Sequence, residues 1–254
     1  MGSLTLESRH ILNVRVDATN YEDATARILG WAREARSCYV CLGTVNAIME
    51  ARASGAYQRV MRDADLVTSD GMPLVWLLRW LGVPHASRVY GPDLTPVLLA
   101  AAAKHGMPVG FYGGSQPVLA KLVETLGRRF PELKIAYSYS PPFRPLQPEE
   151  DERIIREIEA AGVRILFVGL GGAKQDYWMH AHRGRVNAVM LGVGAAFDFL
   201  AGSKPQAPRW MQRAGLEWLF RLCTEPRRLW RRYLTRNPRF AVLALAQLIR
   251  NRLG

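Results

Sequence analysis

The stretch Cys41–Gly71, CLGTVNAIMEARASGAYQRVMRDADLVTSDG, decides the fold. It opens with the end of an apolar run that is typical of a buried strand, and this run stops at Gly43. Thr44 and Asn46 follow at once, and after an amphipathic segment the chain reaches Asp70. In open α/β sheets, residues just beyond the carboxyl ends of strands line the ligand crevice. The stretch therefore predicts that a hydroxyl, an amide and a carboxylate meet at one edge of a sheet, as a candidate active site.

The rest of the chain alternates segments typical of strands with segments typical of helices. We expect a half-exposed strand at 11–16, further strands at 109–112, 135–139, 163–168 and 186–191, and helices at 21–36, 72–81, 94–104, 118–129 and 149–160. This alternation indicates an α/β fold, a Rossmann-like parallel sheet with helices on both faces. We assign residues 1–206 to the α/β domain and residues 207–254 to a basic helical C-terminal appendage.

Three of the expected strands end in glycines. The turns contain Gly113-Gly114, Gly169 with Gly171-Gly172, and Gly192 with Gly194. Such turns allow backbone N–H groups to approach a phosphate, although none forms a complete dinucleotide-binding fingerprint and no P-loop is present. The same glycines could simply allow helices to pack closely on the strands. Three turns in register favour a nucleotide-type ligand.

The charge of the chain is concentrated near its C-terminus. The net charge is +12, and residues 221–254 supply +8 of it, from nine arginines and one glutamate. A tail of this kind indicates a phosphate-bearing partner, which could be nucleic acid, an anionic lipid or a pyrophosphate substrate. Three cysteines are too few for a disulfide framework and fit a reducing cytoplasm. We find no signal peptide in the polar residues 1–9 and no apolar run of the roughly 20 residues that span a bilayer, so we expect a soluble or peripheral protein.

Three patterns with metal-binding spacing are interpreted as structural. Cys38 and Cys41 lie three residues apart in the strand before Gly43, so their side chains should point to opposite faces. In the segment Asp63-Ala-Asp65 we expect a solvated first aspartate and a structural second one. The pair in His180-Ala-His182 has no carboxylate or cysteine at a recognised spacing, so we expect surface histidines.

Six segments occur in the order in which one known family has them, and over nearly its whole length the chain resembles the WecG/TagA/CpsF glycosyltransferases (glycosyltransferase family 26). The segments are Thr44-Val-Asn46-Ala, Ala64-Asp65-Leu with Asp70-Gly71, Arg88-Val-Tyr-Gly91-Pro-Asp93, Phe111-Tyr-Gly-Gly114, Val168-Gly-Leu-Gly-Gly-Ala-Lys174-Gln175, and the parts of the tail from Gly192 to Arg231. The resemblance implies an inverting, metal-independent transfer of a sugar from a UDP-sugar, with no other cofactor. The sugar would be of the N-acetylmannosamine type, its uronic acid, or of the glucose type. The acceptor would be a polyprenyl-pyrophosphate-linked saccharide, and the enzyme would act as a peripheral protein at the cytoplasmic face of the inner membrane during cell-surface polysaccharide biosynthesis.

The resemblance also implies roles for single residues. Asp70 would be the catalytic base, with Thr44 and Asn46 beside it, while Gln175 would line the pocket and Asp198 would contact the uridine. Three tail arginines match those of the family and would neutralise the departing diphosphate in place of a metal ion: Arg221, Arg228 and Arg231. With them we predict substrate contacts from the glycine turns, at Gly113, Gly114, Gly169, Gly192 and Gly194.

The appendage carries a second expectation. Aromatic residues lie between arginines in the segment 227–234, as in helices that lie on a membrane surface. We therefore expect the appendage to bind an anionic bilayer and to close over the active site, and the simpler alternative is that its arginines are membrane anchors only. Two other functions remain open, a nucleic-acid-binding protein and an NAD-type oxidoreductase. Our interpretation includes no nucleic-acid partner and leaves a homo-oligomer possible.

Overall fold

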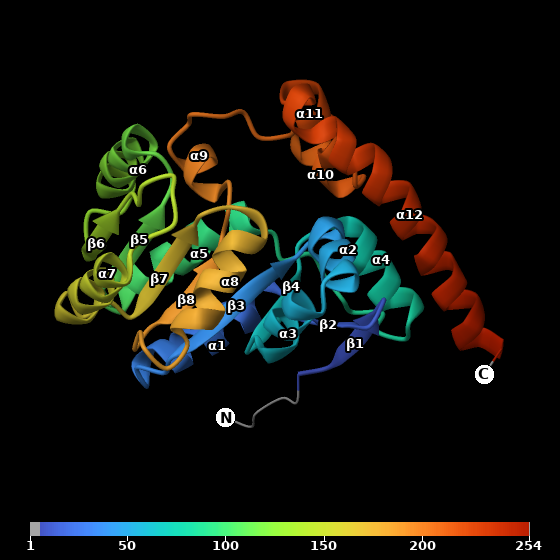
Figure 1. Cartoon of the computed structure of the whole chain (residues 1–254), viewed down its shortest axis with the longest axis horizontal. Coiled ribbons are helices and arrows are strands. Elements are labelled where there is room, and N and C mark those ends of the chain that lie inside the picture. Colours follow the sequence, from blue (N-terminus) through green and yellow to red (C-terminus); the bar gives the residue numbers. More distant parts are fainter. Residues whose placement is uncertain (1–5, 254) are drawn as a thin grey trace.

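A computed structural model describes residues 6–253 and contains two separate sheets (Figure 1). The larger has six parallel strands in the order β4-β3-β8-β7-β5-β6. These strands are β3 (Cys38–Gly43), β4 (Leu66–Ser69), β5 (Val109–Gly113), β6 (Ile135–Tyr139), β7 (Ile165–Gly169) and β8 (Val189–Gly192). The Rossmann-like parallel sheet predicted from the sequence is confirmed. All carboxyl ends of its strands lie at one edge, where parallel sheets bind ligands.

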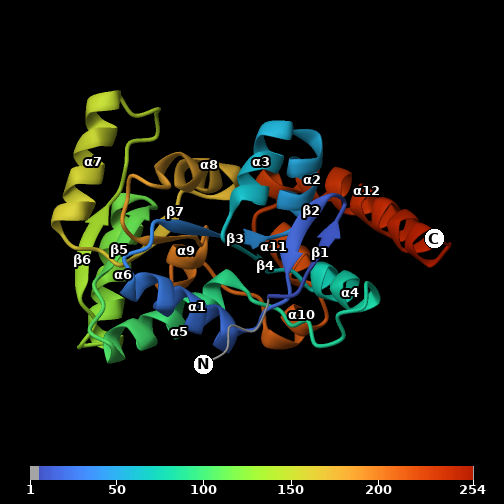
Figure 2. The same ribbon diagram turned by 90° about the horizontal axis from the view of Figure 1, so that it is seen from below.

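Helices cover both faces of this sheet (Figures 1 and 2). One face packs against α1 (Tyr21–Arg33), α5 (Gly91–Lys104), α6 (Gln116–Arg129) and α9 (Ala196–Leu200). The other packs against α2 (Val45–Ala53), α3 (Gly55–Asp63), α4 (Met72–Trp80), α7 (Pro148–Ala160) and α8 (Gly172–His182). Successive strand residues enter different cores, so Cys38 lies on one face and Cys41 on the other. Both thiols are free and buried, which confirms that they cannot share a ligand.

The prediction of a single strand at 11–16 is wrong. The structure has a hairpin instead, formed by β1 (Ser8–Ile11) and β2 (Val14–Asp17). Leu12 and Asn13 adopt positive φ angles of 50° and 69°, as the two central residues of a type I′ turn must. The carboxylate of Asp17 accepts a hydrogen bond of 2.7 Å from the amide of Val67, which fixes the hairpin beside β4.

The predicted role of Asp65 is confirmed. Its carboxylate accepts a hydrogen bond from the amide of Tyr39 and pairs with Arg36 at 2.9 Å and Arg183 at 3.1 Å. These contacts lie where β3 and β4 begin, at the sheet edge opposite the strands' carboxyl ends. Asp63, at the end of α3, is partly exposed and pairs with the exposed Arg62.

The prediction of two surface histidines is wrong for His182. This side chain is buried, stacks on the ring of Trp178 at 3.9 Å and lies 2.9 Å from the carboxylate of Asp151. His180 is half-buried and contacts the hydroxyl of Tyr39. Since α8 is covered by α3 and α7, both rings face neighbouring elements of the fold.

Three helices form the appendage: α10 (Arg209–Arg213), α11 (Glu217–Thr224) and α12 (Pro226–Leu253). Figure 1 shows α12 running diagonally past α2 and α4. Phe240 and Ala244 of α12 are buried in the core that also contains residues of α2 and α4. The side chain of Gln247 accepts a hydrogen bond from the amide of Leu12 and donates one to the carbonyl of His10, which joins α12 to the hairpin. Within residues 6–253, no helix combines the length and the apolarity needed to cross a membrane.

Candidate functional site

A cavity of about 600 Å³ lies between the carboxyl ends of the strands and the appendage. Its walls come from β3 and the start of α2, from α4, from the segment 88–92, from the turns after β7 and β8, and from α10, α11 and α12. The cavity therefore lies at the sheet edge that the sequence predicted, and the appendage supplies the opposite wall.

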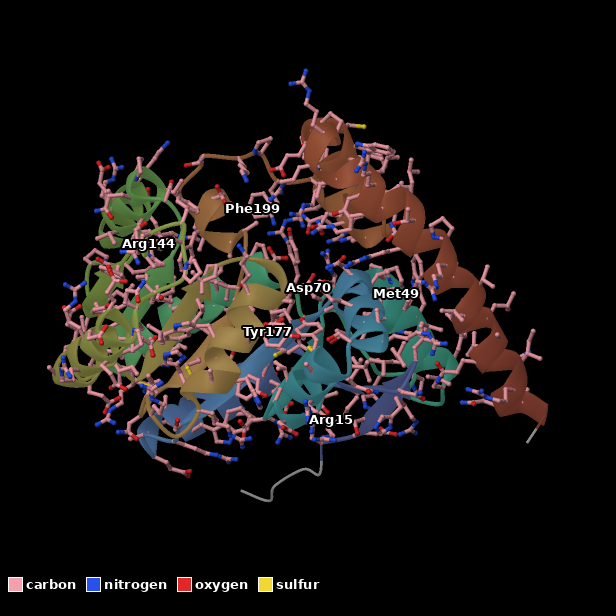
Figure 3. The ribbon with its side chains drawn as sticks, in the orientation of Figure 1. Arg15, Met49, Asp70, Arg144, Tyr177 and Phe199 are labelled. Atoms are coloured by element: carbon pink, nitrogen blue, oxygen red, sulfur yellow. The ribbon has the colours of Figure 1, made fainter. Side chains whose placement is uncertain are left out.

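Asp70 follows β4 directly and lines this cavity (Figure 3). Its amide donates a hydrogen bond of 2.9 Å to the carbonyl of Gly43, and its carboxylate accepts one of 3.1 Å from the amide of Gly91. Burial raises the pKa of Asp70 to about 6; Glu217 adds to this rise, while Arg88, the Gly91 N–H and Arg221 oppose it. The carboxylate can thus accept a proton near neutral pH.

Arg88 connects Asp70 to the appendage. Its guanidinium donates to the backbone carbonyl of Asp70 and pairs with the carboxylate of Glu217 in α11. It also lies 4.0 Å from the ring centre of Tyr90 and 3.4 Å from the side-chain oxygen of Gln212 in α10. Arg88 and Glu217 are about 15% exposed, so this pair is largely shielded from water. Arg88 belongs to a segment that carries the family resemblance, but its sequence context indicated no role for this residue.

Thr44 and Asn46 line the same cavity as Asp70, so the structure brings these three predicted residues together. The hydroxyl of Thr44 accepts a hydrogen bond of 3.1 Å from the amide of Ala47 and caps α2. The side-chain oxygen of Asn46 accepts a hydrogen bond from Arg236 of α12, and its side-chain nitrogen donates one to Glu50. Both side chains therefore organise the cavity wall, and their catalytic roles stay predictions.

Gln175 holds two glycine turns together. Its side-chain oxygen accepts hydrogen bonds from the amides of Gly171 at 3.2 Å and Gly194 at 3.0 Å. Gln175, Gly192 and Gly194 all line the cavity. A Cβ atom on Gly192 would lie 2.8 Å from the amide nitrogen of Gln175, so this close approach requires glycine.

Gly113, Gly114 and Gly169 are outside the cavity lining. A Cβ atom on Gly169 would lie 2.6 Å from the ring of Phe197, and one on Gly113 would lie 2.6 Å from the carbonyl carbon of Gly169. Close packing therefore accounts for these two glycines, the alternative that the sequence left open. The structure does not bring these three glycines to Asp70, and their predicted contact with substrate stays a prediction.

Asp198 is also outside the cavity lining. It lies in α9, and its carboxylate is 3.6 Å from the ammonium of Lys204. The next residue, Phe199, does line the cavity (Figure 3). The structure thus brings α9 to the site through Phe199, and the predicted uridine contact of Asp198 stays a prediction.

The tail arginines divide between the cavity and the surface. Arg221 and Arg228 line the cavity, together with Arg232, which the sequence analysis did not select. Burial and the nearby charges of Arg221 and Arg232 lower the pKa of Arg228. Arg231 is outside the lining, with its guanidinium 5.2 Å from the ring centre of Trp230. Because Arg228 and Arg232 are four residues apart on one helix, they share one face, which borders the cavity although the side chain of Arg228 is 58% exposed.

This group of three arginines favours an anion. Arg228 pairs with Glu225, yet the Nε atom of Arg232 is buried and has no hydrogen-bond partner among the described residues. Three guanidinium groups that approach one cavity repel one another until a negative ligand compensates their charge. A diphosphate meets that requirement, because arginine binds phosphate oxygens in paired hydrogen bonds.

Asp176 is a second carboxylate in the cavity wall that sequence reasoning missed. It is buried and accepts a hydrogen bond from the hydroxyl of Tyr57. Burial raises its pKa to about 7 despite this bond. Its other oxygen has no hydrogen-bond partner among the described residues. The only sequence signal was its position next to Gln175, which does not distinguish it from a surface residue of α8.

No metal centre is evident in the described part of the chain. Across residues 6–253, no three side chains of histidine, cysteine, aspartate or glutamate gather as a metal would require. The cavity places arginines near Asp70, with Arg221 close enough to affect its pKa. The metal-independent reaction implied by the resemblance stays a prediction.

Comparison with known proteins gives one family. The sequence model of the Glycosyl transferase WecG/TagA/CpsF family matches residues 9–254. A protein of Bacillus spizizenii, described as N-acetylglucosaminyldiphosphoundecaprenol N-acetyl-beta-D-mannosaminyltransferase, is 34% identical over 187 residues, 73% of this chain and 70% of the relative. A Bacillus subtilis protein of the same description is 30% identical over 192 residues, 75% of this chain and 72% of the relative.

The raised pKa of Asp70 predicts that this residue costs stability. The folded protein disfavours the ionised carboxylate, so the cost is present above pH 6, decreases as the pH falls from about 6 toward the ordinary value of 3.8, and is absent below it. We expect Asp70→Asn to raise the free energy of unfolding at pH 8 by about 1–3 kcal/mol and to leave it unchanged near pH 4. Urea unfolding at both pH values measures this. Asp63→Asn, at the partly exposed end of α3, is the control; an equal gain there, or a loss at pH 8 for Asp70→Asn, would contradict the prediction.

Proposed function

The chain belongs to the WecG/TagA/CpsF family of glycosyl transferases, and from this premise we propose that it transfers a sugar from a UDP-sugar to a saccharide on a polyprenyl diphosphate. The descriptions of the two Bacillus relatives favour N-acetylmannosamine as the sugar and diphosphate-linked N-acetylglucosamine as the acceptor. The observation that carries this proposal is one cavity in which a carboxylate of pKa about 6 lies with three arginines of the appendage.

The reaction is an inverting displacement. Asp70 takes the proton from the attacking hydroxyl of the acceptor sugar, and the resulting oxygen forms a bond to the anomeric carbon of the donor. The bond from that carbon to the diphosphate breaks on the opposite side, and UDP leaves with the electron pair. Each transfer therefore inverts the configuration at the anomeric carbon.

The charge that develops on the leaving diphosphate needs positive partners. Arg221, Arg228 and Arg232 of the appendage are placed to supply them at the cavity wall. The N-terminus of α8 adds to this, because Gly172 and Ala173, the first two residues of the helix, line the cavity, whereas the N–H of Gly171 before them is bound by Gln175. Unpaired N–H groups at a helix N-terminus favour a phosphate. Gln175, which fixes Gly171 and Gly194, keeps these backbone groups in place.

The appendage also supports a peripheral membrane location. Besides its arginines, α12 carries exposed apolar residues outside the cavity lining: Trp230, Leu234, Val242 and Ile249. A helix of this composition binds an anionic lipid surface through apolar insertion and charge. We place the protein on the cytoplasmic face of the inner membrane, where a UDP-sugar and a lipid-linked acceptor can meet. Its self-association remains open.

If Asp70 is the base, its replacement should lower turnover, and the activity of the wild type should decrease at low pH. With Asp70→Asn we expect the turnover number to fall by about 10²–10⁴-fold, because the variant cannot accept the proton. For the wild type, kcat/KM should fall as the pH drops below about 6, as Asp70 becomes protonated. Release of UDP from UDP-N-acetylmannosamine, with polyprenyl-diphosphoryl-N-acetylglucosamine as acceptor, measures both. Asp63→Asn should retain full activity, and wild-type turnover in Asp70→Asn would remove Asp70 from this role.

The arginines facing the cavity predict a position-dependent effect. Arg228→Ala and Arg232→Ala should each lower kcat/KM by about 10–100-fold, the effect of losing a hydrogen bond to a charged group. Arg227→Ala is the matched control, because Arg227 is exposed and outside the cavity lining. Equal losses at 227 and 228 would indicate a general charge effect of the tail. Arg231→Ala, assayed beside them, tests the role that the resemblance gives to Arg231.

Membrane binding predicts a dependence on the outer face of α12. The double change Leu234→Glu with Val242→Glu should reduce flotation with vesicles that contain phosphatidylglycerol by at least about tenfold. The reason is that it replaces exposed apolar residues with negatively charged ones, which the negatively charged lipid repels. Val97→Glu, at an exposed apolar residue of α5, should leave flotation unchanged. Undiminished flotation of the double variant would show that α12 is not the membrane contact.

A further inference from the structure

The cavity has a second part that the transfer reaction itself does not use. Apolar side chains of α4 and α12 line this part, and we call it the apolar arm. Its walls include Trp76, Leu77 and Trp80 of α4, and Phe240, Leu245 and Leu248 of α12. Among the described residues that line the cavity, neither α4 nor the part of α12 after Asn237 contributes a charged side chain.

The apolar arm is closed at its floor and open at its rim. Leu77 and Phe240 are 4% and 5% exposed, whereas Trp80 and Leu245 are 66% and 60% exposed. Trp76 packs against the turn between α10 and α11, because a Cβ atom on Gly215 would lie 2.8 Å from its ring. The wall formed by α4 is thereby fixed against the appendage.

The position of the arginines orients any occupant. Arg228 and Arg232 line the same cavity and precede the arm residues along α12, as does Tyr233, whose ring packs edge to face on Trp218. From Arg232 to Leu248 the helix extends about 24 Å, at 1.5 Å per residue. A ligand that fills both parts therefore carries an anionic group at one end and an extended apolar chain attached directly to it.

An exposed apolar groove of this length is unfavourable in water unless something covers it. A second copy of the chain or a phospholipid tail would cover the arm without using the arginines at its inner end. A polyprenyl diphosphate uses both, since its diphosphate adjoins the first isoprene unit. The apolar arm differs from the outer face of α12 because the arm is continuous with the cavity that contains Asp70.

We propose that the apolar arm binds the isoprene units next to the diphosphate of the acceptor, and so draws the acceptor out of the bilayer until its diphosphate reaches the arginines. This inference rests on the proposed function and adds to it the recognition of the lipid by the protein. The chain length of the acceptor then affects binding even where no membrane is present.

The test compares two soluble ligands in the absence of vesicles and below their micelle concentrations. Farnesyl diphosphate and butyl diphosphate share the anionic group and differ in the apolar chain. Calorimetry should give a dissociation constant at least about tenfold lower for farnesyl diphosphate with the wild type, because more apolar surface is buried. The double variant Trp80→Asn with Leu245→Asn, at two exposed positions, should reduce this ratio to about 1–2 and leave the affinity for butyl diphosphate unchanged.

Val242→Asn is the matched control, because Val242 is 69% exposed on α12 and outside the cavity lining. It should retain the wild-type preference. Equal affinity of the wild type for both ligands, or a preference that survives in the double variant, would overturn the inference. Equally tight binding of a farnesyl ligand with a neutral headgroup would also overturn it, in favour of a general lipid site.

The same acceptors, carrying N-acetylglucosamine on the diphosphate, separate this inference from the proposed function. The double variant should raise KM for the farnesyl acceptor by about tenfold and leave kcat and the KM of the UDP-sugar unchanged. Suppose that binding depends on chain length but no sugar is transferred from the UDP-sugar to either acceptor. The proposed reaction would then be refuted, whereas lipid binding by the apolar arm would be supported.

Discussion

The shielded ion pair between Arg88 and Glu217 is the contact on which the site depends. It joins the segment after β4 to the appendage, two parts of the chain separated by 129 residues. Breaking one partner of such a pair leaves an uncompensated charge, which is far more costly than the loss of a surface pair. With the pair in place, α11 stands over Asp70 and brings Arg221 to the cavity. The position of the appendage and the proton affinity of Asp70 are therefore set by the same group of charges, since Arg88, Glu217 and Arg221 all act on that carboxylate.

The cavity balances two kinds of charge in separate places. Asp70 and Asp176 lie on the sheet side, where burial raises the pKa of each, and Arg221, Arg228 and Arg232 lie on the appendage side, while Arg88 is paired with Glu217. A nucleotide diphosphate between the two sides would compensate the arginines and leave the carboxylates toward the acceptor. This arrangement explains how one fold can attract a strongly anionic donor and still keep a carboxylate available as a base.

The sequence allowed the prediction of features that depend on local pattern. Thr44, Asn46 and Asp70 were predicted together because each follows a strand, and a parallel sheet aligns the carboxyl ends of its strands. The hairpin was missed because Leu12-Asn13 lacks the glycine that usually marks such a turn. The glycines of β5 and β7 were ambiguous because close helix packing and phosphate binding need the same missing side chain; Phe197, which decides the matter for Gly169, is 28 residues away in the sequence. Arg88 with Glu217, and the inward-facing Arg232, depend on how distant helices pack, and no local pattern contains that information.

Gln247 has a consequence for the order in which the molecule is assembled. Its side-chain amide bonds to Leu12 in the hairpin turn and to His10 in β1, across 235 and 237 residues of chain (Figures 1 and 2). Contacts of such sequence separation form late, because the entropy of closing the intervening loop must first be offset by other structure. The hairpin is synthesised before α12, so the α/β body can act as the template on which this helix settles. A nascent chain can thus complete its sheet while the wall opposite Asp70 is still absent, and it gains the enclosed cavity only when α12 docks.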